Sequence, residues 1–390
     1  MRISQVLTAA AGLLGTTHGL NILITNDDGF GTANIRELYN QMKSLGHNCY
    51  IVASVSSQPD GQFREGFTTH PTLTADGDWG LVKAGAPSLG FDPADNHIWY
   101  YNGTAAAQVV IALDYILPTY GKIASPDLVI SGPNAAATSD FFLQSFSGTM
   151  SATYVAIERD IPAMVFWTGN TVPIPYTWLN TSTKTGLQDP STITARLASS
   201  LVEAFITKAA GGRVLPQGYG VTVKLPYITS ATSEQCTNPP FVLQRMSAGE
   251  VGAKATYNAK TGLFTQIHGA SSGINNLFAD DIDESIEAAN STCVSSVTVF
   301  AVKYDTTYHR ECFNVTDVTA IIPVVVQING SVPVPDGLGP NASVSSNVSQ
   351  SPPDGPSPQS HPPAIISMGS AAQWSSSAIM LGLAIWGFTY

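Results

Sequence analysis

The hydrophobic and polar residues of this chain follow two alternating periods. Short apolar runs rich in β-branched residues predict buried strands at residues 21–25, 47–53, 127–131 and 163–167. Helical spacing predicts helices at residues 34–45, 105–117, 148–158 and 192–209, the second of them ended by Pro118. Strands that alternate with helices in this way predict an α/β fold, with a Rossmann-like, doubly wound and mostly parallel sheet between two layers of helices.

The pattern becomes richer in β-structure after Tyr219. Apolar and β-branched runs predict strands near residues 221–225, 241–245 and 294–302. We expect these strands to form a C-terminal subregion of the same domain, which serves contacts in a homo-oligomer. The irregular segment from Ser54 to about Thr72 contains glycine and is predicted to be a loop.

The N-terminal residues resemble a secretory signal peptide. Met1 and Arg2 precede an apolar run from Val6 to Leu14, and small residues suited to cleavage follow it. The run is too short to span a bilayer as a helix. We therefore expect residues 1–19 to be removed, and the mature chain, secreted or held at the cell surface, to begin near Leu20.

The C-terminal residues differ in composition from the rest of the chain. Residues 331–377 are dominated by small and polar residues and by proline, and predict a disordered stalk. The apolar run at residues 378–390 follows small residues at 369–372, a pattern that resembles a GPI-attachment signal and predicts membrane attachment through a lipid. A frayed tail without a lipid is the alternative.

Between these ends, residues 20–330 are enough for one large α/β domain with a sizeable core. The chain has 28 acidic and 17 basic residues and a net charge of −11. This balance argues against a nucleic-acid polymer as partner, because such polyanions are bound by basic surfaces. A small phosphorylated substrate is compatible with it if a cation supplies the positive charge.

Sequons and cysteines agree with export. N-glycosylation sequons begin at Asn180, Asn290, Asn314, Asn329, Asn341 and Asn347. Cys49 lies in a predicted core strand and is expected to be buried and free. Cys236, Cys293 and Cys312 allow three single pairings, among which the sequence does not choose.

The most informative stretch is NILITNDDGF, at residues 21–30. Its apolar strand ends abruptly at Asn26, Asp27 and Asp28, which places two carboxylates at the carboxyl end of a strand, where open α/β sheets bind ligands. Adjacent carboxylates repel each other unless a cation neutralises them, and Mg²⁺ or Mn²⁺ prefers oxygen ligands of this kind. An ordinary turn rich in Asp and Gly is the alternative.

Two further loops are expected at the same edge of the sheet. Asn134 follows the strand at residues 127–131, and Ser147, Gly148 and Thr149 open a helix. A helix N-terminus with small residues binds phosphate through its free N–H groups and its dipole. Taken singly, Asn134 suits a turn and Ser147 suits a helix cap. Together with the two carboxylates they indicate metal-assisted hydrolysis of a phosphoester.

These motifs resemble those of the SurE-type survival-protein family of metal-dependent nucleotidases and acid phosphatases. The matching segments are ITNDDG at residues 24–29, VISGPN at 129–134, FSGT at 146–149, NGT at 102–104 and LPQGYGV at 215–221. The resemblance covers most of residues 20–320. It implies a divalent-metal-dependent phosphomonoester hydrolase acting on nucleoside monophosphates or related phosphoesters.

The resemblance also implies roles for single residues. Asp27 and Asp28 would bind the divalent ion and act in catalysis, and Asn134 would be a third ligand. Asn26, Ser147, Gly148 and Thr149 would hold the phosphate. The family's fourth ligand is a serine in the loop after the second strand, where this chain has Asp60 as the replacement, with Ser57 as the alternative.

Several departures from the family pattern favour an alternative function. Alanines occupy residues 135–137, where the family has a glycine-rich loop, and residues 32–35 read TANI instead of Ala-Pro-Gly-Ile. A catalytically impaired SurE-like cell-surface glycoprotein is therefore the second hypothesis. A dinucleotide-binding protein is disfavoured because Asn34 stands where a third glycine is needed. A serine hydrolase is disfavoured because no Gly-x-Ser-x-Gly elbow occurs.

Overall fold

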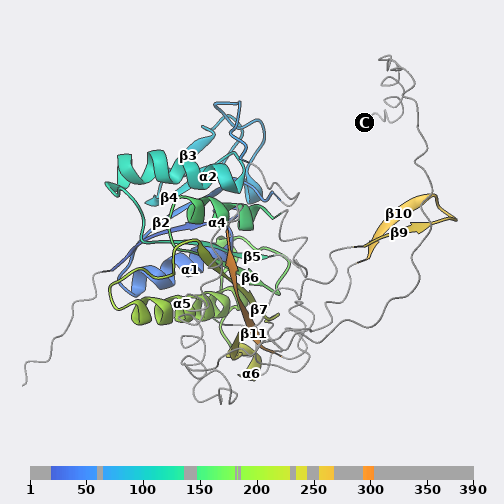
Figure 1. The fold of residues 1–390 in the computed structure, drawn as a ribbon. Helices are drawn as coiled ribbons and strands as arrows, with labels where there is room; N and C mark the ends of the chain where they lie inside the picture. Colours follow the sequence, from blue (N-terminus) through green and yellow to red (C-terminus); the bar gives the residue numbers. More distant parts are fainter. Residues whose placement is uncertain are drawn as a thin grey trace, which may run out of the picture. The chain divides into compact units, whose positions relative to one another are not determined.

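The computed structural model describes residues 19–58, 65–135, 147–180, 182, 186–228, 234–243, 254–267 and 293–302. A mixed sheet of nine strands dominates it, in the order β3-β4-β2-β1-β5-β6-β7-β11-β8 (Figure 1). The six central strands, from β4 to β7, are parallel to one another. Strand β3 runs antiparallel to β4, and β11 runs antiparallel to β7 but parallel to β8. The predicted α/β fold with a mostly parallel sheet is confirmed.

The strands at the centre of the sheet carry β-branched and aliphatic residues that are almost fully buried. Their bounds are β1 Asn21–Thr25, β2 Asn48–Ser54, β5 Leu128–Ala135, β6 Ala163–Thr168 and β7 Tyr219–Leu225. Alternate side chains of one strand enter different cores, as Ile22 and Leu23 of β1 do. Burial on both faces explains why these strands read as continuous apolar runs.

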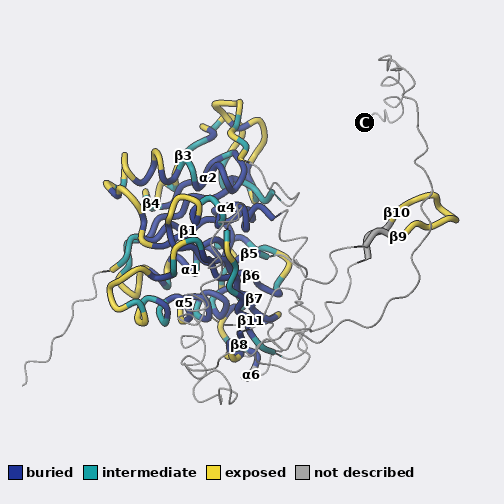
Figure 2. The backbone as a smooth tube through the Cα atoms, in the orientation of Figure 1, coloured by how far each residue is buried: buried dark blue, intermediate teal, exposed yellow. Residues whose placement is uncertain are grey.

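Two pairs of helices cover the two faces of the sheet. Helices α1 (Ala33–Ser44) and α5 (Pro190–Ala209) pack on one face, and α2 (Ala105–Ile111) and α4 (Gly148–Glu158) on the other (Figure 1). Figure 2 shows that buried backbone is concentrated between these layers. A doubly wound arrangement of this kind leaves the loops at the carboxyl ends of the strands free to form a site.

The structure corrects one sequence prediction and adds a hairpin. The helix that begins at Ala105 does not stop at Pro118 but continues as a π-helical stretch, η2 (Ala112–Gly121). Pro118 lacks an N–H, so the helix continues through it with one backbone hydrogen bond fewer. No sequence prediction covered β3 (Leu89–Asp92) and β4 (Asp95–Tyr101), which form a hairpin at the sheet edge.

The C-terminal part contains the expected strands. Strand β8 spans Phe241–Leu243 and β11 spans Ser295–Ala301, and a short helix, α6 (Glu234–Thr237), precedes β8. Strands β9 (Lys254–Asn258) and β10 (Leu263–Ile267) form a separate antiparallel hairpin. The expected homo-oligomer stays a prediction.

The cysteines are assigned in the described part of the chain. Cys236 and Cys293 form a disulfide, one of the three pairings that the sequence allowed. Cys49 is buried and free as predicted, and burial raises the pKa of its thiol to about 12. Cys312 lies outside the described residues, as do the predicted signal peptide up to residue 18, the stalk and the apolar tail.

Candidate active site

The site lies where the strand order reverses. Strand β1 pairs with β2 on one side and with β5 on the other, and the chain winds outward from this pair in both directions. The loops after β1 and β5 therefore diverge at the carboxyl edge, which leaves a crevice for a ligand. Asp27 and Asp28 follow β1, and Asn134 lies near the end of β5. The structure thus brings together residues separated by more than a hundred positions.

The turn after β1 is shaped by Asn26. Its side-chain oxygen accepts a hydrogen bond from the N–H of Gly29 (3.1 Å), and its amide nitrogen lies 3.4 Å from the hydroxyl of Thr32. Gly29 adopts a φ of 117°, a conformation that suits glycine. Asn26 is fully buried and bonds within this turn. In this conformation it positions the two carboxylates, and its expected contact with phosphate stays a prediction.

Thr149 connects the two sides of the crevice. Its hydroxyl donates to a carboxylate oxygen of Asp27 and accepts a hydrogen bond from the side-chain nitrogen of Asn134 at 2.7 Å. The second bond fixes the orientation of the Asn134 amide. Because the hydroxyl proton is already given to Asp27, a phosphate would meet the backbone N–H of Thr149 rather than its side chain.

Helix α4 begins at the carboxylates. Ser147 is its N-cap and accepts a hydrogen bond from the N–H of Met150 at 3.3 Å, as its capping role predicted. The first helical residue, Gly148, has to be glycine, since a Cβ there would lie 2.6 Å from Oδ2 of Asp27. The first N–H groups of a helix lack partners within it, so this end offers donors to an anion beside the carboxylates.

Burial makes the two carboxylates costly in their charged form. Desolvation raises the pKa of Asp27 above its ordinary value, although the hydrogen bond from Thr149 opposes it. Desolvation, then the charge of Asp27 and to a lesser extent that of Asp78, raises the pKa of Asp28 to about 8, against the opposing hydrogen bond from the N–H of Ala135. A bound cation would remove this penalty, because it favours the ionised form of both groups.

The donor set fits a hard divalent cation. Among the described residues, the buried side-chain oxygen of Asn134 accepts no hydrogen bond, whereas its amide nitrogen donates to Thr149. A buried acceptor of this kind is uncommon without a ligand. Within the described ranges no group of three or more His, Cys, Asp or Glu residues gathers, so two carboxylates and one amide form the set. Oxygen-only donors of this kind suit Mg²⁺ or Mn²⁺.

The loop after β2 was expected to supply a fourth ligand. Asp60 lies outside the described residues, and so does the alanine-containing loop from residue 136 to 146. The described start of the loop contacts the site, because the N–H of Gln58 donates to the carbonyl of Asp27 at 2.8 Å. The backbone N–H of the alternative, Ser57, binds the carboxylate of Asp78.

Asp78 is a residue near the site that the sequence did not reveal. It opens a short 3₁₀ turn, η1 (Asp78–Gly80), fifty residues after Asp28 in an irregular segment. Its backbone N–H donates to the hydroxyl of Ser56 at 3.2 Å, and its carboxylate accepts from Ser57. An Asp that follows Gly77 in a segment without periodicity gives no signal of this position.

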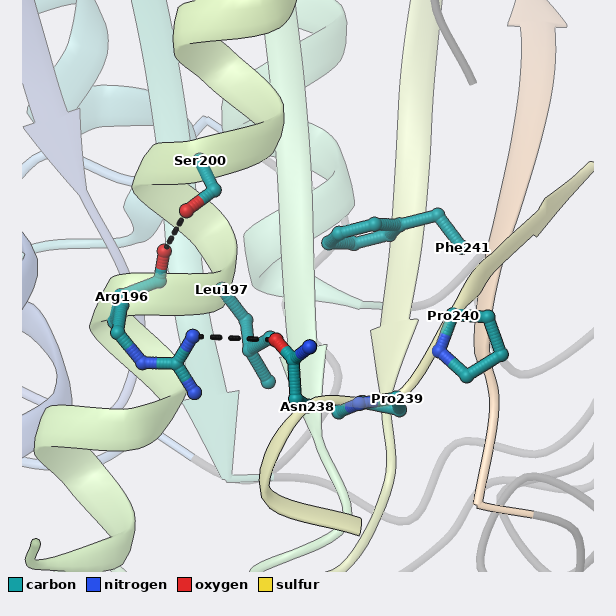
Figure 3. A pocket seen from close by; sticks show the side chains of 7 residues that line it. All are labelled: Arg196, Leu197, Ser200, Asn238, Pro239, Pro240 and Phe241. Carbon is teal, nitrogen blue, oxygen red and sulfur yellow. Dashed lines mark hydrogen bonds between the residues drawn. The ribbon is translucent and has the colours of Figure 1, made fainter. Parts of the chain in front are cut away.

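A separate cavity of about 340 Å³ lies between α5 and the segment before β8 (Figure 3). It is lined by Arg196, Leu197, Ser200, Asn238, Pro239, Pro240 and Phe241. The guanidinium of Arg196 donates to the side-chain oxygen of Asn238 (3.4 Å) and to the carbonyl of Thr237. This lining contains no carboxylate, so it does not provide the ligands that a divalent cation needs.

Comparisons with known proteins identify relatives of the chain. The model of the family described as "Survival protein SurE" matches residues 22–245. An acid phosphatase of Yarrowia lipolytica is 30% identical over 318 residues, which are 78% of this chain and 87% of that protein. The similarity to this phosphatase therefore extends over most of both chains.

Other relatives are bacterial. A 5'-nucleotidase SurE of Trichodesmium erythraeum is 32% identical over 158 residues, covering 39% of this chain and 50% of that protein. One of Synechocystis is 33% identical over 145 residues, covering 37% and 46%. The SurE protein of Aquifex aeolicus, a solved structure, gives a TM-score of 0.45 at 19% identity, over 73% of this chain and 95% of that one. The chain thus spans about half the length of the two nucleotidases.

Proposed function

The chain belongs to the SurE family, and from this premise we propose that it is a divalent-metal-dependent phosphomonoester hydrolase. Its substrates would be nucleoside monophosphates or related phosphoesters, since its relatives are named acid phosphatase and 5'-nucleotidase. The observation that carries the proposal is the unpartnered, buried oxygen of Asn134, which lies at the strand crossover with Asp27 and Asp28. These three side chains would hold the cation.

The residues of the site have separate tasks in this proposal. Asp27, Asp28 and Asn134 supply the negative charge and the oxygen donors, and Thr149 holds Asp27 and Asn134 in place. A cation bound there polarises a phosphoryl oxygen and lowers the pKa of water. The N–H groups at the start of α4, at Gly148 and Thr149, bind the phosphoryl oxygens and stabilise their charge in the transition state.

We also propose that the chain is exported. The Cys236–Cys293 disulfide supports an oxidising compartment, because such bonds persist mainly outside the cytosol. Asn180, the first residue of one sequon, is exposed and accessible to glycosylation. No helix in the described part of the chain is long and apolar enough to cross a membrane. Removal of residues 1–19 and lipid attachment at the C-terminus belong to the same proposal.

Hydrolysis of p-nitrophenyl phosphate tests the proposed activity. The purified chain should hydrolyse it with Mg²⁺ or Mn²⁺ and lose that activity with a chelator. The variant Asp28→Asn removes one charged ligand and should lose at least about a hundredfold in kcat/KM. Loss of a residue that binds the metal directly weakens metal binding and, with it, the activity. The variant's circular dichroism spectrum should match that of the unchanged protein.

The matched control is Asp114→Asn. Asp114 is an exposed carboxylate on η2 that pairs with Arg159, away from the crevice. This variant should keep full activity. If the chain binds Mg²⁺ but shows no chelator-sensitive turnover of any phosphoester, the catalytically impaired surface glycoprotein becomes the better description. Full activity in Asp28→Asn would contradict the assignment of the site.

A further inference from the structure

An exposed indole lies beside the turn that carries the carboxylates. Trp79 is 40% exposed, and its ring atom Cε3 lies 3.9 Å from the position that a Cβ on Gly31 would occupy. Gly31 follows Asp28 by three residues, a separation that a peptide chain spans over at most about 10 Å. The indole is therefore next to the crevice and open to solvent.

The segment that carries Trp79 is tied to the site from a second direction. The preceding residue, Asp78, binds the backbone N–H of Ser57 with its carboxylate. The next residue of that loop, Gln58, donates its N–H to the carbonyl of Asp27. The hydrogen bonds of Asp78 and Gln58 thus tie the Trp79 segment to the turn of the carboxylates, and the indole lies near Gly31 of the same turn.

The backbone conformation at Trp79 is unusual for a bulky residue. Its φ is 54° and its ψ is 13°, in the left-handed region. Glycine or asparagine would adopt this conformation with less strain. Strained residues of this kind persist where the surrounding structure holds them, and they are concentrated at ligand sites. A large apolar ring that is both strained and exposed is unfavourable for folding, which points to a role in binding.

We propose that Trp79 determines substrate specificity by stacking on a planar aromatic ring in the leaving group of the phosphoester, such as a nucleobase. This inference rests on the proposed function and adds the residue that recognises the leaving group. An exposed indole face binds any aromatic base with little regard to its hydrogen-bonding edge. The site would therefore favour aromatic over aliphatic phosphoesters and discriminate weakly among bases.

Two measurements on the full chain test the inference. The first is the equilibrium binding of adenosine, which has the aromatic ring but no phosphate to hydrolyse. The second is the KM for adenosine 5'-monophosphate and for glycerol 2-phosphate, with Mg²⁺ present. Trp79→Gly should weaken adenosine binding and raise the KM for the nucleotide by about tenfold or more, because stacking on an aromatic residue is lost.

The same variant should leave the KM for glycerol 2-phosphate and the kcat for both esters within about twofold, since the phosphate and metal contacts are untouched. Trp79→Phe keeps a ring and should recover most of the binding. Tyr115→Ala is the matched control: Tyr115 is 45% exposed, on the helix that leads to the amino end of β5. It should change neither measurement.

The outcomes separate this inference from the proposed function. If wild type does not bind adenosine, or if Trp79→Gly binds it equally well, the inference is wrong even when phosphoesters are hydrolysed. An equal rise of both KM values in Trp79→Gly would likewise overturn it, because a general distortion of the site would then be the cause. If neither ester is hydrolysed but adenosine binding still depends on Trp79, the proposed function fails and the subsite stands.

Discussion

At the scale of single residues, Thr149 holds the site together. Its one hydroxyl serves a carboxylate from the turn after β1 and an amide from the end of β5. Both partners lie outside helix α4, so the bonds exist only in the assembled fold. The order of a metal site depends on such outer contacts, because they orient the groups that touch the metal.

Replacing Thr149 with valine should weaken cation binding. The change keeps the shape of the side chain but removes a hydrogen bond to a charged group, a contribution of about 1.5–3 kcal/mol. We expect the dissociation constant for Mg²⁺ to rise roughly tenfold to a hundredfold, measured by calorimetry. Thr149→Ser should bind nearly as wild type.

Thr153→Val is the control for helix α4. Within the described residues, the Thr153 hydroxyl donates to the carbonyl of Thr149 alone, and Thr153 is equally buried. Its replacement therefore tests packing without changing a bond to the carboxylates. A similar loss of affinity in both valine variants would show that helix stability, and not the link to Asp27, sets the binding.

The carboxylate pair predicts a pH dependence of metal binding. Burial and the charge of Asp27 raise the pKa of Asp28 from 3.8 to about 8, so between these values the folded, metal-free chain holds a proton that the unfolded chain has released. This group therefore favours folding less and less as the pH rises through that window. A cation displaces the proton and should restore the loss.

Thermal unfolding with and without Mg²⁺ measures this linkage. The rise in Tm on adding Mg²⁺ should grow from about pH 5 to about pH 8, and cation affinity should increase as the proton becomes easier to displace. Asp28→Asn should show a flat response over the same range. A Mg²⁺ effect that is independent of pH in the unchanged protein would contradict the raised pKa.

The sequence predicted the positions of some residues of the site but not of others. Asp27, Asp28 and Asn134 follow predicted strands, and the geometry of parallel sheets brings such positions together. The contact of Thr149 with Asp27 depends on side-chain rotamers and could not be read from spacing. Asp78 could not be found either, because its loop has no periodicity.

At the scale of elements, the start of helix α4 is packed directly against a carboxylate. The absence of a side chain at Gly148 allows Asp27 to approach the helix end. Sequence predicted Ser147, Gly148 and Thr149 as a phosphate-binding start. It did not predict that the glycine is needed for the carboxylate as well.

Gly148→Ala should therefore disable the site without unfolding the helix. The new Cβ would lie 2.6 Å from Oδ2 of Asp27, so the carboxylate must move. A misplacement of about 1 Å can cost about a hundredfold in kcat/KM, whereas alanine is a better helix former than glycine. Activity should fall while the helical signal in circular dichroism stays unchanged.

Gly212→Ala is the matched control. Gly212 lies beyond the end of α5, and among the described residues a Cβ there would meet only the carbonyl oxygen of Ala209, at 3.1 Å. The variant should keep full activity. Normal kcat/KM in Gly148→Ala would mean that Asp27 does not need its present position.

Helices and strands were predictable where the spacing of apolar residues kept one period, helical or extended, over the whole element. Helix α4 has the predicted bounds, and β1 does too, since a buried strand reads as one apolar run. The hairpin of β3 and β4 was missed because its strands are short and lie at the sheet edge. The run HIWYY at residues 97–101 of β4, rich in aromatic residues, was the available signal.

At the scale of the whole molecule, the fold divides its tasks between the centre and one edge of the sheet. The crossover of β1 and β5 supplies the site, whereas β11 and β8, which run parallel to each other and antiparallel to β7, extend the sheet beyond β7. The disulfide ties α6, just before β8, to the start of β11, across 57 residues. The sequence allowed this pairing but could not select it, because chain proximity in the fold decides it.

Removing the disulfide should destabilise the folded chain without changing its activity. Closing a loop of this length restricts the unfolded chain by about 4 kcal/mol in the loop-entropy description. The double variant Cys236→Ser and Cys293→Ser should therefore lose about 2–4 kcal/mol in the free energy of unfolding, measured by urea denaturation. Its KM for p-nitrophenyl phosphate should stay the same, since neither cysteine contacts the carboxylates.

Reduction provides the matched control for this variant. A thiol reductant should lower the stability of the unchanged protein to that of the double variant and leave the double variant unaffected, because Cys49 is free and buried. The disulfide also reports on the cellular compartment in which the chain folds. A chain that forms this bond only when it passes through an oxidising environment supports export, since cytosolic thiols stay reduced. Equal stability of the cytosolic and exported forms, both without the bond, would remove that support and leave the N-terminal residues as the remaining argument for secretion.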